Sequence, residues 1–197
     1  MARIPPLSPD EFAPELQAVL GPDALGRPDQ LGSLRVWARR PDLAVALHTF
    51  MQAAKEASQL SPRLVELVRL RVAFHNQCRS CMARRSPDAI GDGVSEELVC
   101  ELVRPEEAPD LTDRERAALA YADRLAVAHH DIDDEVFDRL RVHFTDEEII
   151  ELGLHIAVCI GLGRVAMSWD LVDELPEGLR ADGPVGPWDA VIGSVPA

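Results

Sequence analysis

The sequence has few of the features that place a protein in a membrane or on nucleic acid. No stretch approaches the roughly 20 apolar residues of a membrane-spanning helix, and residues 1–6 contain no apolar segment of the kind found in secretion signals. Basic residues are also scarce, because 20 Lys and Arg stand against 34 Asp and Glu and give a net charge of −14. Nucleic acid and anionic membranes bind basic surfaces. We therefore expect a cytoplasmic protein that binds neither.

Cysteine is scarce as well, and its positions limit its roles. The chain has Cys78, Cys81, Cys100 and Cys159, too few in a reducing compartment for a structural disulfide framework. A zinc site needs four ligands, and no second close pair accompanies Cys78 and Cys81, so no metal is expected. Cys100 and Cys159 are interpreted as small buried apolar side chains. Cys78-x-x-Cys81 remains as a candidate redox pair.

Signals for β-strands are absent, whereas signals for helix starts recur along the chain. Ser61 is an N-cap followed by proline, and Thr112 and Thr145 each open a capping box with glutamate three residues later. The chain is long enough for one domain with its own core. The sequence therefore predicts an all-α fold, with one helical domain over residues 1–175 and an irregular tail over 176–197.

Three of the predicted helices are distinguished by how they end, by their length or by their composition. The first starts at Ser8 and ends at Gly21-Pro22, because glycine and proline both disfavour continuation of a helix. A short one is expected over residues 81–85. The last, over 146–172, is apolar on nearly every side, which is typical of a helix that is buried centrally or shared between subunits.

The stretch from about residue 60 to 102 resembles the carboxymuconolactone decarboxylase and alkylhydroperoxidase D-like family. The residues that carry the resemblance there are Glu66, Asn76, the Cys78-x-x-Cys81 pair and Gly93-Val94-Ser95, and it extends over about residues 40–172 through Tyr121, Thr145 and Arg164. The resemblance implies an all-helical fold, a homo-oligomer that is usually a trimer or hexamer, and no metal or bound organic cofactor.

The peroxidase branch of the family reduces hydroperoxides with such a pair. The resemblance implies that Cys81 attacks the peroxide, that Cys78 resolves the resulting sulfenic acid as a disulfide, and that Glu66 begins a proton relay. A dithiol or thioredoxin-like partner would supply the electrons. The leading interpretation is therefore a thiol-dependent peroxidase or disulfide reductase.

The sequence departs from the peroxidase pattern at two positions where the family has relay histidines, because Ser80 and Arg85 stand there. Arginine stays protonated and cannot act as a base, but its charge favours a neighbouring thiolate. Our hypothesis is that Arg85 bridges Glu66 and Cys81 electrostatically. His75 is an alternative base, or else an exposed polar helix end.

A shared site for Glu66 and Cys81 requires a bend between them. One straight helix over residues 66–81 would separate the two by about 22 Å, at a rise of about 1.5 Å per residue. We therefore predict that the chain turns back at Asn76-Gln77.

Two other functions remain open. The first is a lyase or isomerase acting on a small organic acid, with Arg85 binding the carboxylate, although the decarboxylase branch typically lacks the cysteine pair. The second is a non-catalytic oligomer whose cysteines sense the redox state.

Overall fold

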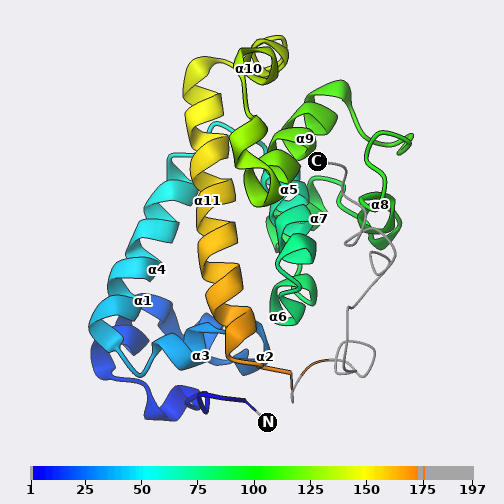
Figure 1. Cartoon of the computed structure of the whole chain (residues 1–197). Coiled ribbons are helices and arrows are strands. Elements are labelled where there is room, and N and C mark those ends of the chain that lie inside the picture. The colour runs from blue at the N-terminus through cyan, green and yellow to red at the C-terminus, as the bar shows by residue number, and fades with distance from the viewer. Residues whose placement is uncertain (1, 173–174, 176–197) are drawn as a thin grey trace.

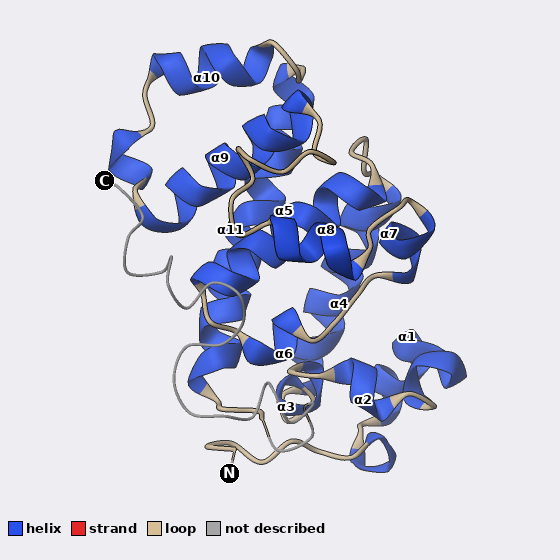
Figure 2. Cartoon of the chain, turned by 90° about the vertical axis from the view of Figure 1, so that its right-hand side faces the viewer, coloured by secondary structure: helices blue, strands red, loops and turns tan. Residues whose placement is uncertain are grey.

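Every regular element that the computed structural model describes is a helix (Figures 1 and 2). The described residues are 2–172 and 175, and the predicted tail over 176–197 lies outside them. The all-α prediction is confirmed. In chain order the elements are the single-turn helix η1 (Pro9–Glu11), α1 (Pro14–Leu25), α2 (Pro28–Leu31), α3 (Leu34–Trp37), α4 (Pro41–Glu56), α5 (Pro62–His75), α6 (Arg79–Met82), α7 (Pro87–Gly91), α8 (Glu96–Glu101), α9 (Asp113–Val127), the single-turn helix η2 (His129–Asp131), α10 (Asp134–Arg141) and α11 (Asp146–Ser168).

The predicted start signals lie at the observed helix starts. The Ser61 side chain accepts a hydrogen bond from the N–H of Leu64. Both capping boxes form, so Thr112 and Thr145 close the N-termini of α9 and α11. Each cap satisfies backbone groups that would otherwise lack partners, which stabilises a helix by about 1 kcal/mol.

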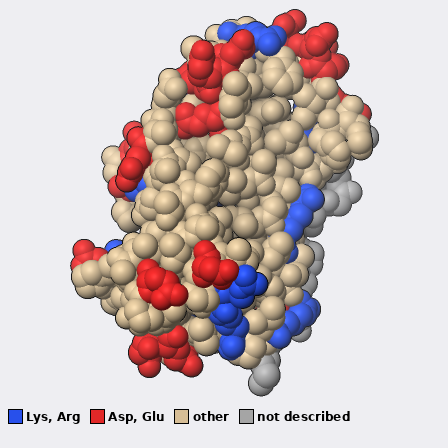
Figure 3. All heavy atoms as spheres, turned by 90° about the vertical axis from the view of Figure 1, so that its left-hand side faces the viewer, with Lys and Arg blue, Asp and Glu red and all other residues tan. Residues whose placement is uncertain are grey.

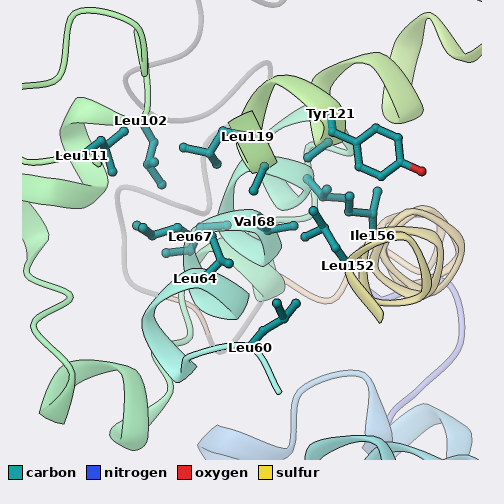
Figure 4. Packing of buried hydrophobic residues seen from close by; sticks show 14 of the residues in the cluster. Leu60, Leu64, Leu67, Val68, Leu102, Leu111, Leu119, Tyr121, Leu152 and Ile156 are labelled. Carbon is teal, nitrogen blue, oxygen red and sulfur yellow. The ribbon is translucent and has the colours of Figure 1, made fainter. Parts of the chain in front are cut away.

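Helix α5 is the centre of the main core and packs against α9 and α11. Its apolar side chains are almost completely buried, and each fully buried leucine contributes about 1.5–3 kcal/mol. The same helix carries the polar residues of the candidate site, so core packing fixes their position. Figure 4 shows how the three helices meet through Leu64, Leu67 and Val68 of α5, Leu119 and Tyr121 of α9, and Leu152 and Ile156 of α11.

The N-terminal helices form a second, smaller apolar cluster around Phe12 and Leu16. The bounds of α1 correct the prediction of a helix from Ser8 to Gly21-Pro22. Helix α1 begins at Pro14 and continues after Gly21 instead of ending there. Gly21 has φ +74° and interrupts the helical path, and Pro22 then starts a further turn. The rings of Trp37 and Trp169 pack edge-to-face with their centroids 5.1 Å apart, and this contact joins the cluster to the end of α11.

Helix α11 is 23 residues long and is buried on one side only. Ile150 is 73% exposed and Leu154 is 44% exposed, and both lie on the outer side. By length and composition α11 could cross a membrane, with a mean hydropathy of 1.8 in its most apolar window, so the expectation that no stretch reaches this length was wrong. In the structure its inner side packs against α5 and α9 as a bundle helix.

The segment after helix α4 reaches α11, where the N–H of Gln59 donates to the carboxylate of Glu151 at 2.9 Å. Helix α4 also exposes apolar side chains, namely Leu43, Phe50 and Met51. Figure 3 shows the face on which α4 lies in Figure 1, and the middle of that face is almost free of charged residues. Acidic and basic side chains gather toward its margins (Figure 3). The chain therefore presents a broad face with few charged residues, although its net charge is −14.

Candidate active site

The predicted bend between Glu66 and Cys81 is confirmed. Helix α5 ends at His75, and Gln77 adopts a left-handed conformation with φ +50°. The N–H of Cys78 then donates to the carbonyl of Ala73 at 3.0 Å, which folds the chain back over the end of α5. Cys78 is the N-cap of α6, so α6 begins and ends earlier than the short helix predicted over residues 81–85.

Asn76 fixes this bend to helix α11. Its Nδ2 donates to the carbonyls of Cys159 and Ile160 at 2.9 and 3.3 Å, and its Oδ1 accepts from Nε of Arg164 at 3.1 Å. The contact is so close that a Cβ atom at Gly163 would lie 2.5 Å from Nδ2. A glycine at this position therefore lets the buried amide reach the helix backbone.

Cys78 and Cys81 form a disulfide, with Cα atoms 5.2 Å apart. The two sulfur-bearing residues differ in exposure, because Cys78 is fully buried and Cys81 is partly exposed. Ser80 Oγ lies 3.6 Å from the sulfur of Cys78. Of the two cysteines, Cys81 is the more accessible to a molecule from solution.

Glu66 is 3% exposed and its carboxylate accepts three hydrogen bonds. Arg69 donates to both carboxylate oxygens at 2.7 Å, and the N–H of Ser86 donates to one of them at 3.1 Å. Burial opposes ionisation, but these donors outweigh it and hold the pKa of Glu66 below its ordinary value. Glu66 is therefore a carboxylate at neutral pH.

Arg69 links Glu66 to the cysteine segment. Besides binding Glu66, it donates to the carbonyl of Cys81 at 2.7 Å and to that of Arg84 at 2.8 Å. Sequence reasoning missed Arg69. A signal was present, because Arg69 lies three residues after Glu66 and therefore on the same helix face.

Arg85 does not have the bridging role that we predicted for it. Its Nε and Nη2 bind the carboxylate of Glu96 in α8 at 2.7 and 2.9 Å, and its Nη1 binds the carbonyls of Met82 and Arg84. Arg85 thus closes the outer side of the turn, and Arg69 provides the direct contact with Glu66. Through its charge, Arg85 still helps to lower the pKa of Glu66.

His75 belongs to a separate buried ion cluster. Its Nε2 lies 2.7 Å from Oδ1 of Asp123 in α9, and Arg71 binds both oxygens of the same carboxylate at 2.5 and 2.8 Å. The His75 side chain is only 5% exposed, so its interpretation as an exposed helix end was wrong. Burial raises the pKa of Asp123, but His75 and Arg71 lower it by more, so that it lies below its ordinary value.

The remaining cysteines differ from each other. Cys100 is exposed, which contradicts its interpretation as a buried side chain. Cys159 lies partly buried on α11 near the site, and burial raises the pKa of its thiol to about 11. Neither is bonded to another cysteine.

A pocket of about 250 Å³ opens beside the turn that carries the cysteines. Gln77 and Ser80 line it on one side, and the end of α11 lines it on the other. Apolar side chains of this lining include Met167 and Leu171, and Arg3 adds a cation. Within residues 2–172 and 175, no three His, Cys, Asp or Glu side chains form a group that could hold a metal ion.

Comparisons with known proteins agree with this architecture. Residues 41–124 match the carboxymuconolactone decarboxylase family. The protein Rv2313c of Mycobacterium tuberculosis (strain H37Rv) is 33% identical over 150 residues, which are 74% of this chain and 52% of the relative. The chain thus spans about half the length of this curated relative.

Two solved structures share the fold. The Agrobacterium tumefaciens protein ATU0492, described as a putative antioxidant defence protein AhpD, is 27% identical, with a TM-score of 0.60 over 68% of this chain and 92% of that one. The debrominase Bmp8 without ligand is 25% identical, with a TM-score of 0.70 over 86% of this chain and 90% of that one. The predicted alkylhydroperoxidase D-like helical fold is confirmed.

Proposed function

From the match of residues 41–124 to the carboxymuconolactone decarboxylase family and from the Cys78–Cys81 disulfide, we propose that the chain is a thiol-dependent peroxidase or disulfide reductase. The observation that carries the proposal is the pairing of a buried with a partly exposed cysteine on a fixed bend. The likeness to a putative antioxidant defence protein supports it.

The proposed cycle begins with the reduced pair. The thiolate of Cys81 attacks the terminal oxygen of a hydroperoxide, the O–O bond breaks, and Cys81 becomes a sulfenic acid. The alkoxide leaves as the alcohol after taking up the proton that Glu66 removed from the Cys81 thiol. The thiol of Cys78 then attacks this sulfur, water leaves, and the disulfide forms. A dithiol donor returns two electrons and two protons by exchange.

Two side chains assist the first step. Glu66 is ionised, so it can accept the proton of the Cys81 thiol, directly or through water. Arg69 positions it, because the same guanidinium holds the carboxylate and the Cys81 carbonyl. In this scheme Arg69 takes the positioning role that we had predicted for Arg85. The pocket beside Ser80 is the proposed place for the hydroperoxide or the donor.

A second candidate is reductive removal of halogen, and the likeness to a debrominase favours it. The same pair would supply two electrons, a halide ion would leave, and a hydrogen would take its place on carbon. The lyase alternative loses its support, because Arg85 is occupied by Glu96 and is not placed to bind a substrate carboxylate.

The test is an assay of hydroperoxide consumption with dithiothreitol as the donor. We expect Cys81→Ser to abolish turnover and the control Cys159→Ser to keep it. Cys78→Ser should consume one equivalent of hydroperoxide when no dithiothreitol is added, because its sulfenic acid then has no thiol to condense with. Equal rates in wild type and Cys81→Ser would overturn the peroxidase proposal.

The second candidate is tested by measuring the release of bromide from a bromopyrrole. Reversible disulfide formation without turnover on either substrate would favour a redox sensor.

We also propose that the apolar face of α4 and α11 is the contact between copies of the chain. Exposed Leu43 and Phe50 on α4 and Leu154 on α11 provide the apolar surface that homo-oligomers bury. Light scattering after size-exclusion chromatography tests this. Leu154→Glu should give monomers, whereas Ile90→Glu, which changes an exposed residue of α7, should not. A monomeric wild type would contradict the proposal.

We propose in addition that the protein works in the cytoplasm, because a dithiol pair that must return to its reduced form suits a reducing compartment.

A further inference from the structure

A second hollow lies between α9 and α10, on helices that carry neither cysteine of the redox pair. Its volume is about 310 Å³. Figures 1 and 2 both show α10 beside α9, where the two helices contact each other. The side chains that line it are Arg116, Ala117, Ala120, Tyr121 and Arg124 of α9, with Val136, Arg139, Leu140, Val142 and His143 of α10 and the residues after it.

The lining is cationic, which is unusual in a chain with a net charge of −14. It contains three arginines and one histidine but no Asp or Glu. Arg116 pairs with the exposed Asp113 and also donates to the carbonyls of Pro105 and Ala108, so its guanidinium is already engaged. Arg139 pairs with Glu135, whose side chain is 76% exposed, and both acids lie in exposed pairs that contribute little. These acids therefore compete only weakly with a bound anion.

Of the three arginines in the lining, Arg124 is the best placed to bind a ligand. Its residue is partly buried, and within the described part of the chain its guanidinium makes no hydrogen bond or ion pair. A partly desolvated guanidinium gains most from a carboxylate, which can accept two parallel N–H bonds. The position of Arg124 at the hollow thus points to a carboxylate ligand.

The floor of the hollow is apolar. Ala117, Ala120 and Tyr121 of α9 face Val136 and Leu140 of α10, at helical spacings that place them along one groove. An apolar floor with a few charged groups at its rim is the common arrangement of small-molecule sites. The ligand should accordingly carry an apolar body as well as its charge.

We propose that this hollow, the α9–α10 site, binds a small organic anion with an apolar body, such as a medium-chain carboxylate, with its charged group on Arg124. The proposal is independent of the thiol chemistry. It would remain if the peroxidase assay failed, because none of its residues belongs to the redox centre.

Octanoate is the probe, with octan-1-ol as the uncharged match and acetate as the match without an apolar body. The chain has a single tyrosine, Tyr121, and this residue lines the hollow. Isotopic labelling of tyrosine therefore gives one NMR signal that reports on the site. Arg124→Gln removes the anion contact and Arg124→Lys keeps its charge. Arg141→Gln removes a nearby charge that does not line the hollow.

We expect octanoate to shift the Tyr121 signal saturably, and the two matched compounds to shift it much less at the same concentration. Arg124→Gln should weaken binding about tenfold or more, as expected for loss of a charge-assisted contact. Arg124→Lys should restore part of it, and Arg141→Gln should bind as wild type. An unmoved Tyr121 signal, equal binding of octan-1-ol, or equal losses in Arg124→Gln and Arg141→Gln would each overturn the proposal.

Discussion

Arg69 binds both carboxylate oxygens of Glu66 from one turn further along α5, at 2.7 Å each. The same guanidinium holds the carbonyl of Cys81, so the buried carboxylate and the cysteine segment share one partner. Arg69 therefore acts on both the charge of Glu66 and the position of the cysteine segment.

Replacement of Arg69 by methionine should destabilise the protein by about 3–5 kcal/mol, because Glu66 would remain buried without its cation. Urea unfolding at pH 7 measures the loss. The matched control is Arg104→Met, whose ion pair with Glu107 has both side chains 65% exposed, and it should cost less than about 1 kcal/mol. Similar losses in the two variants would show that Arg69 has no special role.

The contact between Gly163 and Asn76 gives a second prediction. Gly163→Ala should destabilise by about 1–3 kcal/mol, because the added Cβ would lie 2.5 Å from the Asn76 amide. Gly161→Ala, on the same helix, places its Cβ in open space and should be neutral or up to about 1 kcal/mol stabilising. Thermal unfolding of both variants compares them, and equal melting temperatures would contradict the close packing.

The thiols of the reduced protein should react with iodoacetamide in a fixed order at pH 8. Cys81 and the exposed Cys100 should react readily, and the buried Cys78 should react slowly. Cys159 should hardly react, because with a pKa of about 11 only about one molecule in a thousand carries the thiolate. Peptide mass spectrometry after timed quenching gives the order. Labelling of Cys159 at the rate of Cys100 would contradict its burial.

Acid should unfold the protein partly through Glu66 and Asp123. Their pKa values in the folded protein lie below ordinary values of 4.5 and 3.8, so the unfolded chain binds more protons in that range. The stability they contribute is complete above about pH 4.5 and is lost as the pH falls through the lowered pKa values.

The unfolding free energy of wild type should therefore fall steeply below about pH 4.5. Asp123→Asn should be less stable at pH 7 and should show a shallower fall. Glu96→Gln, which changes a carboxylate that is 70% exposed, should keep the slope of wild type. Urea unfolding at a series of pH values measures all three, and an unchanged slope in Asp123→Asn would contradict the prediction.

Local signals in the sequence predicted most of the helix starts and the bend. Thr112 and Thr145 carry a cap and a matching glutamate three residues later, and both signals act within one turn. The family resemblance placed Glu66 near Cys81, helix geometry then required a bend between them, and the expected helix end at Asn76 gave its position. Caps and turns of this kind involve residues a few positions apart, so they can be predicted from the sequence alone.

The partners of charged side chains could not be obtained in this way. Arg85 lies four residues after Cys81, as the hypothesis required, but Glu96 from α8 binds it first. His75 has the sequence context of a helix end, and only the packing of α9 brings Asp123 to it. When several arginines lie close together, the tertiary packing decides which one meets which carboxylate.

The bond from the N–H of Ser86 to Glu66 spans only 20 positions along the chain, and that from Arg69 to Cys81 spans 12. Loops of this length close at little entropic cost, and local contacts form early in folding. The acid, its arginine and the two thiols therefore belong to one local unit of the chain. The contacts of Asn76 with α11 then hold the bend of this unit in place, so a single distant helix fixes a centre whose own parts are all neighbours in sequence.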